Sequence, residues 1–191
     1  MLEEDINTII RERRSIFPVE YNGKEVSKAF IKMMLENANY APTHKLTQPW
    51  RFKVLQGSAK ERLAIFLSDT YTDITSETDF SPFKHKKIIR NCNAASAIVA
   101  ICLQRDKKER VPEWEEVASM AMAVQNMWLT CTANKIGCYW SSPKLIDYLG
   151  DFFDFEDGER CYGFFYLGHY DKEQKDASKR DPIEVKVQWL E

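Results

Sequence analysis

The segment 41–50 reads Ala-Pro-Thr-His-Lys-Leu-Thr-Gln-Pro-Trp, an irregular polar stretch that a proline restricts near each end. It follows a predicted helix from Ser27 to Tyr40 and precedes a predicted strand over 51–56. Loops held rigidly between regular elements commonly carry ligand contacts. The alternative is an ordinary connecting loop, with Trp50 in the core and His44 hydrogen-bonded locally.

Helices and strands alternate on both sides of this segment. Apolar residues at helical spacing predict a helix at the N-terminus and a long helix from Pro112 to Asn134. Continuous apolar runs predict two buried strands, 96–103 and 161–168, and a shorter strand covers 138–140. The chain therefore falls in a mixed α and β class.

Two further segments bear on function. Residues 68–82 are rich in Thr, Ser and Asp and lack periodicity, which predicts a flexible loop or lid. Ile183, Val185, Val187 and Trp189 alternate with other residues, a pattern typical of a strand. Because a terminal strand needs a surface to pair with, we expect another subunit to supply that surface.

Length and composition indicate a single domain over 1–191. The 27 Lys and Arg residues against 29 Asp and Glu leave a formal net charge of −2. No overall field therefore favours nucleic acid or an anionic membrane. The longest apolar stretch, 94–103, is about half the length that a bilayer requires. Five cysteines without a Cys-x-x-Cys pair, and no leader ahead of Glu3, predict reduced thiols in a cytoplasmic protein.

Arg13, Arg14 and Ser15 come directly after the first predicted helix. Two guanidiniums and a hydroxyl in consecutive positions suit phosphate oxygens, which accept several hydrogen bonds. The alternative is a solvated basic turn, which the helix dipole also favours at a helix C-terminus. The local pattern leaves both interpretations open.

A second group of polar and aromatic residues follows the strand predicted at 138–140. Tyr139, Trp140, Ser141 and Ser142 lie at a predicted strand-to-helix turn. Backbone amides at a helix N-terminus favour an anion or an electron-rich atom, and the aromatic pair offers surface to a flat ring system. The alternative is an ordinary junction in which Ser142 caps the helix.

Several familiar site patterns are absent from the sequence. It contains neither a Gly-x-Gly-x-x-Gly nor a Walker sequence, and no Gly-x-Ser-x-Gly elbow of a hydrolase. The three histidines are scattered and share no metal spacing with the cysteines, so we predict no metal site. A solvated helix face is expected for the basic residues Lys84, Lys86, Lys87 and Arg90.

Taken in order, these segments resemble the FMN-dependent nitroreductase family, in particular its small bacterial NAD(P)H branch. The resemblance rests on Arg-Arg-Ser at 13–15 and Ala-Pro-Thr-His-x-x-Thr-Gln-Pro-Trp-Arg-Phe at 41–52. It continues with Gly-x-x-Trp-x-Ser at 137–142 and Phe-x-Tyr-Leu-Gly at 164–168. With matching order and spacing, it covers nearly the whole chain.

The resemblance implies a fold and an assembly. The fold is α+β, with a central, mostly antiparallel sheet flanked by helices in one domain. Two subunits interlock as a homodimer, each exchanging a C-terminal strand, so residues 182–191 become an arm around the partner. Two FMN molecules lie at the interface between the subunits.

The resemblance also implies where the phosphate end of FMN binds. Arg13, Arg14 and Ser15 would hold the phosphate and the ribityl chain. A C-terminal basic residue often joins this site in the family, and Arg180 or Lys179 is the counterpart here. Phe17 stands where many relatives have a polar or basic group, which leaves the phosphate more dependent on the two arginines.

The flavin ring has a separate set of implied contacts. His44 would touch the flavin from the proline-bounded loop, and Tyr40 would reach the partner's FMN. Trp140, Ser141 and Ser142 match the segment that lies along the isoalloxazine ring. Tyr40 is aromatic where a basic residue is common, so a stacking contact is expected there.

The activity implied is reduction of nitroaromatic, quinone or similar electron-poor molecules by NAD(P)H, with ping-pong turnover. Thr130 falls where nicotinamide-nucleotide contact is expected. The flavin N5 carries the hydride, so no catalytic side chain is predicted. Two alternatives remain, namely a flavin carrier or sensor without significant turnover and an interaction module that binds no cofactor.

Overall fold

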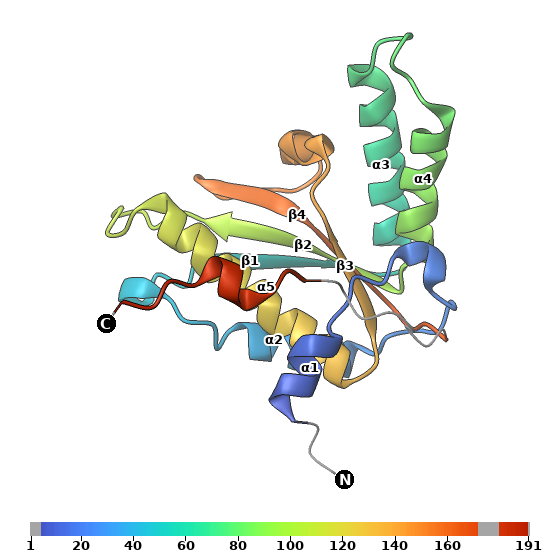
Figure 1. Ribbon diagram of the computed structural model, residues 1–191. Helices are drawn as coiled ribbons and strands as arrows, with labels where there is room; N and C mark the ends of the chain where they lie inside the picture. The colour runs from blue at the N-terminus through green and yellow to red at the C-terminus, as the bar shows by residue number, and fades with distance from the viewer. Residues whose placement is uncertain (1–4, 172–179, 191) are drawn as a thin grey trace.

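The computed structural model describes residues 5–171 and 180–190, and its centre is an antiparallel sheet of four strands (Figure 1). The strand order across the sheet is β1-β2-β4-β3, and each neighbouring pair is antiparallel. The strands are β1 (Trp50–Leu55), β2 (Ala97–Gln104), β3 (Gly137–Ser141) and β4 (Glu159–Gly168). This arrangement confirms the predicted α+β class.

The two central strands are the apolar runs of the sequence. Every residue of β2 from Ala97 to Leu103 is buried, and so are the β4 residues Phe164 to Leu167. Side chains of a strand alternate between its two faces, so a strand that is apolar throughout must be covered on both sides. Ala97, Val99 and Leu103 accordingly join one buried cluster, while Ile98, Ala100 and Cys102 join the other.

Helices cover both faces of the sheet. One buried cluster lies under α2 (Lys28–Ala38) and α5 (Glu113–Ala133), with α1 (Ile6–Glu12) packed beside α5. The other lies under α3 (Ser58–Ile74), α4 (Pro82–Ala94) and the 3₁₀ helix η3 (Lys144–Asp151). Further 3₁₀ turns are η1 (Pro18–Glu20), η2 (His44–Leu46) and η4 (Ile183–Lys186). In the described part of the chain, no helix has the length and apolar character to cross a membrane.

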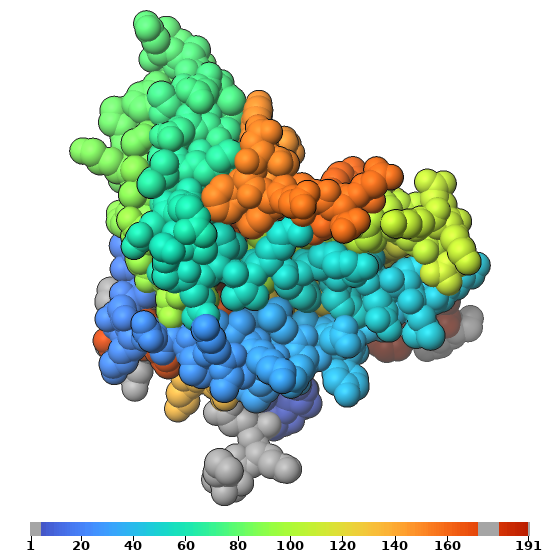
Figure 2. All heavy atoms as spheres, turned by 180° about the vertical axis from the view of Figure 1, so that it is seen from behind, coloured from blue at the N-terminus to red at the C-terminus, as the bar shows by residue number. Residues whose placement is uncertain are grey.

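The prediction of a flexible loop over 68–82 is wrong. Helix α3 continues to Ile74 and α4 starts at Pro82, so only a short connection separates them. The hydroxyls of Ser68, Thr70 and Thr72 donate to backbone carbonyls three or four residues earlier, at 2.8–3.0 Å. Since these polar side chains are satisfied within the helix, their abundance did not signal a loop. The two helices form a hairpin that projects from the body as a lobe (Figure 2).

The terminal strand is absent from the described residues of a single chain. The segment instead contains η4, and Ile183, Val185, Val187 and Trp189 are exposed, Trp189 to 87%. A strand requires a neighbour for its N–H and C=O groups, and among the described residues of one copy this segment pairs with no strand. Pairing of the tail with a second subunit stays a prediction, as does the exchanged strand.

Candidate functional site

The turn after α1 packs against the middle of the molecule and forms what we call the arginine corner, Arg13 to Ser15. The Ile16 N–H donates to the Cys138 carbonyl at 2.9 Å, which ties the corner to β3. The Trp128 indole Nε1 donates to the Arg14 carbonyl at 2.9 Å. The Arg13 guanidinium lies over the same indole, 4.7 Å from the ring centroid, so α5 fixes the position of the corner.

Positive charge gathers at this corner from both ends of the chain. The pKa of Arg13 is lowered by burial and by the nearby charges of Arg180 and Arg14. Such a cluster of guanidiniums is unfavourable unless an anion or another acceptor balances it. Together with the exposed Ser15, the arginines supply the charge and the hydrogen-bond donors that a phosphate group requires. The donor set therefore fits the phosphate of FMN.

The end of β3 holds the second predicted group. The Trp140 Nε1 donates to the Tyr162 carbonyl at 3.2 Å, and the strand lies against Gly163. Gly163 has a φ of +139°, and a Cβ there would lie 2.5 Å from both the Trp140 Nε1 and the Ser141 carbonyl oxygen. Only glycine allows this close approach of the two strands, which positions Trp140 and Ser141.

The prediction that Ser142 caps a helix is wrong. The following element is η3, whose N-cap residue is Pro143, and no side chain caps it. Ser142 is exposed and Ser141 is half-buried. Both residues lie at the end of β3, where the resemblance places the isoalloxazine ring.

The Thr43 hydroxyl holds the proline-bounded loop, since it lies 3.2 Å from the Thr47 hydroxyl and accepts the Gln48 N–H at 3.1 Å. Lys45, Leu46 and Gln48 have φ angles of 51°, 53° and 44°, which is unusual for residues other than glycine. The His44 Nδ1 lies 2.5 Å from the Glu115 Oε2, while Tyr40 is 86% exposed.

Trp50 donates to the Asn39 Oδ1 at 3.0 Å and is buried. The core position considered for Trp50 is therefore confirmed.

One chain does not bring all the predicted flavin contacts together. His44 bonds to Glu115 at the start of α5, whereas Arg13 lies on Trp128, thirteen residues later. At 1.5 Å per helical residue, these two positions are roughly 20 Å apart along α5. His44 and the arginine corner therefore lie toward opposite ends of the helix.

Thr130 lies in the interface between α2 and α5. It is 8% exposed, and its hydroxyl donates to the Asn126 carbonyl at 2.8 Å and accepts from the Asn37 Nδ2 at 3.0 Å. Its hydrogen-bonding groups are occupied within the fold. These hydrogen bonds do not support the predicted contact of Thr130 with a nicotinamide nucleotide, which stays a prediction.

A cavity of about 500 Å³ lies between the α3–α4 hairpin and the end of β3, and we call it the hairpin cavity. Ser141 lines it, which connects it to the predicted ring segment. Lys84, Lys87 and Asn91 of α4 also line it. These three residues were not expected at a site, although their spacing of three and four places them on one helix face.

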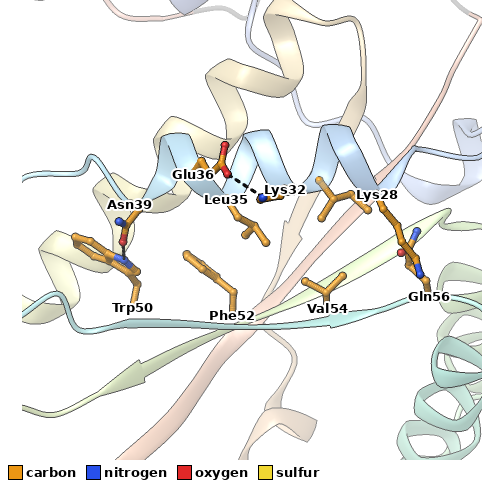
Figure 3. Close-up of a pocket in the computed structure, with 10 residues that line it drawn as sticks. Lys28, Lys32, Leu35, Glu36, Asn39, Trp50, Phe52, Val54 and Gln56 are labelled. Atoms are coloured by element: carbon orange, nitrogen blue, oxygen red, sulfur yellow. Dashed lines mark hydrogen bonds and ion pairs between the residues drawn. The ribbon is translucent and has the colours of Figure 1, made fainter.

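A groove of about 480 Å³ separates α2 from the edge strand β1 (Figure 3). Leu35, Phe52 and Val54 point into it from the helix and the strand. At its rim, Lys32 and Glu36 form an ion pair at 3.7 Å. We call this feature the α2–β1 groove; it offers apolar surface next to β1, which is an edge strand of the described sheet.

Comparison with known proteins agrees with this architecture. The family model described as "Nitroreductase family" matches residues 10–169. The protein named "Putative NAD(P)H nitroreductase YfhC" from Bacillus subtilis (strain 168) is 30% identical over 185 residues, which covers 93% of this chain and 90% of that protein.

Two crystal structures show the same fold. The nitroreductase-like family protein of Bacillus cereus superposes with a TM-score of 0.83 at 23% identity, covering 100% of this chain and 98% of that chain. The FMN-dependent nitroreductase NfnB of Mycobacterium smegmatis, in complex with NADPH, gives a TM-score of 0.74 at 16% identity and 97% coverage of both chains. On the family match and the curated relative, this chain belongs to the nitroreductase family.

Proposed function

We propose that this protein binds FMN and uses NAD(P)H to reduce electron-poor small molecules. The observation that carries the proposal is the arginine corner, where the Arg13 guanidinium is held over Trp128 and the charges of Arg14 and Arg180 act on it. NfnB, which shares the fold, is described as FMN-dependent and was crystallised with NADPH. When bound, FMN supplies the hydride-transfer chemistry.

The residues of the chain bind and orient the cofactor. Arg13, Arg14 and Arg180 hold the phosphate, and the Ser15 hydroxyl binds the ribityl chain. Packing on Trp128 keeps the Arg13 guanidinium from sampling other directions, which lowers the entropy lost on binding. The segment from Trp140 to Ser142 lies along the isoalloxazine ring.

The overall reaction balances without a side-chain nucleophile. One NAD(P)H and one proton convert a quinone into a hydroquinone, or a nitro group into a nitroso group and water. The oxidised nicotinamide nucleotide leaves before the acceptor binds, which gives ping-pong kinetics.

We infer that two copies complete the site as a homodimer. His44 lies toward the opposite end of α5 from the arginine corner, so the flavin at that corner receives its loop contacts from the partner subunit's His44 and the partner subunit's Tyr40. The exposed apolar residues of the tail favour the same assembly. We propose that the tail binds in the partner subunit's α2–β1 groove, because this groove combines apolar side chains with an edge strand of the described sheet.

Arg13→Ala tests the flavin site. We expect FMN affinity to fall about tenfold or more, since hydrogen bonds between charged groups contribute about 1.5–3 kcal/mol. Arg90→Ala, at an exposed position of α4, is the control and should leave the affinity unchanged. Fluorescence titration with FMN measures both, and equal affinities would show that the phosphate binds elsewhere.

Turnover is tested on the purified wild-type protein. Under anaerobic conditions NAD(P)H should bleach the bound flavin, and a nitroaromatic or quinone should restore its colour. Bound flavin that NAD(P)H cannot reduce would identify a carrier or sensor. Protein that takes up no FMN would contradict the proposed function altogether.

A further inference from the structure

The hairpin cavity has three lysines along its lining. Lys84 and Lys87 come from α4, and Lys144 comes from the start of η3. Within residues 5–171 and 180–190, none of the three forms an ion pair with a carboxylate. The acidic residue in the lining, Asp79, accepts a hydrogen bond from the Ser76 hydroxyl at 2.7 Å. The cavity therefore has a net positive lining.

Apolar and aromatic side chains form much of the rest of the wall, beside a few hydroxyl and amide groups. Leu67, Tyr71 and Ile74 come from α3, Ile88 comes from α4, and Tyr166 comes from β4. The volume of about 500 Å³ lies in the range of small-molecule sites, which combine mostly apolar walls with a few polar groups. Such a wall suits the body of an aromatic ring.

We propose that the hairpin cavity binds the electron acceptor, and that this acceptor is an aromatic compound bearing a carboxylate or a similar acidic group. The ring packs against Tyr71 and Ile88, and the acidic group lies among the lysines. This inference rests on the proposed function, because Ser141 belongs both to the cavity and to the segment assigned to the flavin ring.

The test compares 4-nitrobenzoate with 4-nitrobenzamide, two compounds of nearly equal shape. In each reaction, NAD(P)H and one proton convert the nitro group to a nitroso group and water. The amide withdraws more electron density from the ring than the carboxylate, so intrinsic reactivity favours 4-nitrobenzamide. A preference for 4-nitrobenzoate therefore measures recognition of its charge. We expect wild-type kcat/KM to be about tenfold higher for 4-nitrobenzoate, since exposed ion pairs each contribute a few-fold.

The lysines are tested by the double variant Lys87→Gln/Lys144→Gln. The kcat/KM ratio of the two compounds should fall to about one in this variant. Lys86→Gln is the matched control, because it removes a neighbouring charge of α4 that does not line the cavity, and it should retain the wild-type ratio. Added NaCl should lower the wild-type ratio, since salt screens exposed charges.

Three results would overturn the inference: a wild-type ratio of one or less, an unchanged ratio in the double variant, or loss of FMN from that variant. The last would show that the lysines serve the cofactor. If wild type reduces neither compound, calorimetry with 4-nitrobenzoate in the absence of NAD(P)H tests the binding site by itself, and the proposed function fails only if a quinone is not reduced either. Affinity about tenfold weaker in the double variant supports the site, and equal affinity overturns it.

Discussion

The Arg13 guanidinium lies 4.7 Å from the centroid of the Trp128 indole, whose Nε1 donates to the neighbouring Arg14 carbonyl. One side chain of α5 thus contacts both arginines of the corner. The cation–π contact orients Arg13, while the hydrogen bond fixes the backbone that carries Arg14. The arginine corner is therefore a packed feature of the fold, in contrast to the solvated turn considered from the sequence.

Trp128→Phe should weaken FMN binding without unfolding the protein. An aromatic ring is retained, but the Arg14 carbonyl loses its donor, which costs about 1 kcal/mol of unfolding free energy. We expect a few-fold weaker FMN affinity for the same reason. Trp114→Phe is the control, because Trp114 is 68% exposed on the same helix. Urea denaturation and FMN titration measure the two effects, and identical values for both variants would contradict this role.

Gly163→Ala should disturb both the sheet and the end of β3. An added Cβ would lie 2.5 Å from the Trp140 Nε1 and the Ser141 carbonyl oxygen, at a positive φ. We expect a loss of about 2 kcal/mol or more in unfolding free energy and a changed Trp140 emission spectrum. Gly150→Ala, where no atom lies within 4 Å of the added Cβ, should be tolerated. Equal stability of the two variants would refute this steric argument.

Glu116→Ala should be strongly destabilising. Glu116 is 1% exposed, pairs with the Arg105 guanidinium and accepts the Asp106 N–H at 3.0 Å. Removing one partner of a buried pair typically costs about 3–5 kcal/mol, because the other charge is left uncompensated. Urea denaturation should show this loss, whereas Glu36→Ala, at an exposed ion pair, should change stability by less than about 1 kcal/mol.

The double variant Arg105→Met/Glu116→Leu should recover part of the stability lost in Glu116→Ala, since no unpaired charge remains. A double variant no more stable than the single one would mean that the loss comes from the cavity or the backbone hydrogen bond.

Cys161 should react first among the five cysteines. Hydrogen bonds from the Cys102 thiol and the Gly163 N–H hold its pKa below the ordinary value of 9.0, and its side chain is half-buried. Burial raises the pKa of Cys92 to about 11. Because the thiolate is the nucleophile, Cys161 should become reactive at a lower pH than Cys92. Iodoacetamide labelling followed by mass spectrometry measures the order, and prior labelling of Cys92 would contradict it.

Truncation after Lys179 should convert the proposed homodimer into monomers or aggregate. The truncation removes the exposed Ile183, Val185 and Trp189, whose burial we assign to the partner's α2–β1 groove. Val54→Asp places a charge in that groove and should have the same effect in light-scattering measurements. Ile65→Asp, on exposed surface of α3 across the sheet, should remain dimeric. A truncated protein that is still a dimer would refute the arm.

Local pattern predicted most of the fold. Continuous apolar runs identified β2 and β4, because a strand that is covered on both faces needs apolar residues at every position. Composition led to a wrong prediction of a flexible loop over 68–82, because the hydroxyls of Ser68 and Thr70 form their hydrogen bonds inside α3. Alternation at the tail predicts a strand that the described residues of one copy do not form; because a strand needs a second backbone, its pairing with a partner subunit stays a prediction.

By itself, the sequence determined the family, the central strands and the arginine pair at 13–14, because these depend on residues close together in the chain. Only the tertiary structure decided that Arg180 lies near Arg13 and that α4 lysines share a cavity with Ser141. It also decided that His44 lies toward the other end of α5 from the corner. The physical reason is that burial of a helix or strand face produces a periodic pattern of apolar residues along the sequence. Contacts between distant segments depend instead on how the helices pack across the sheet.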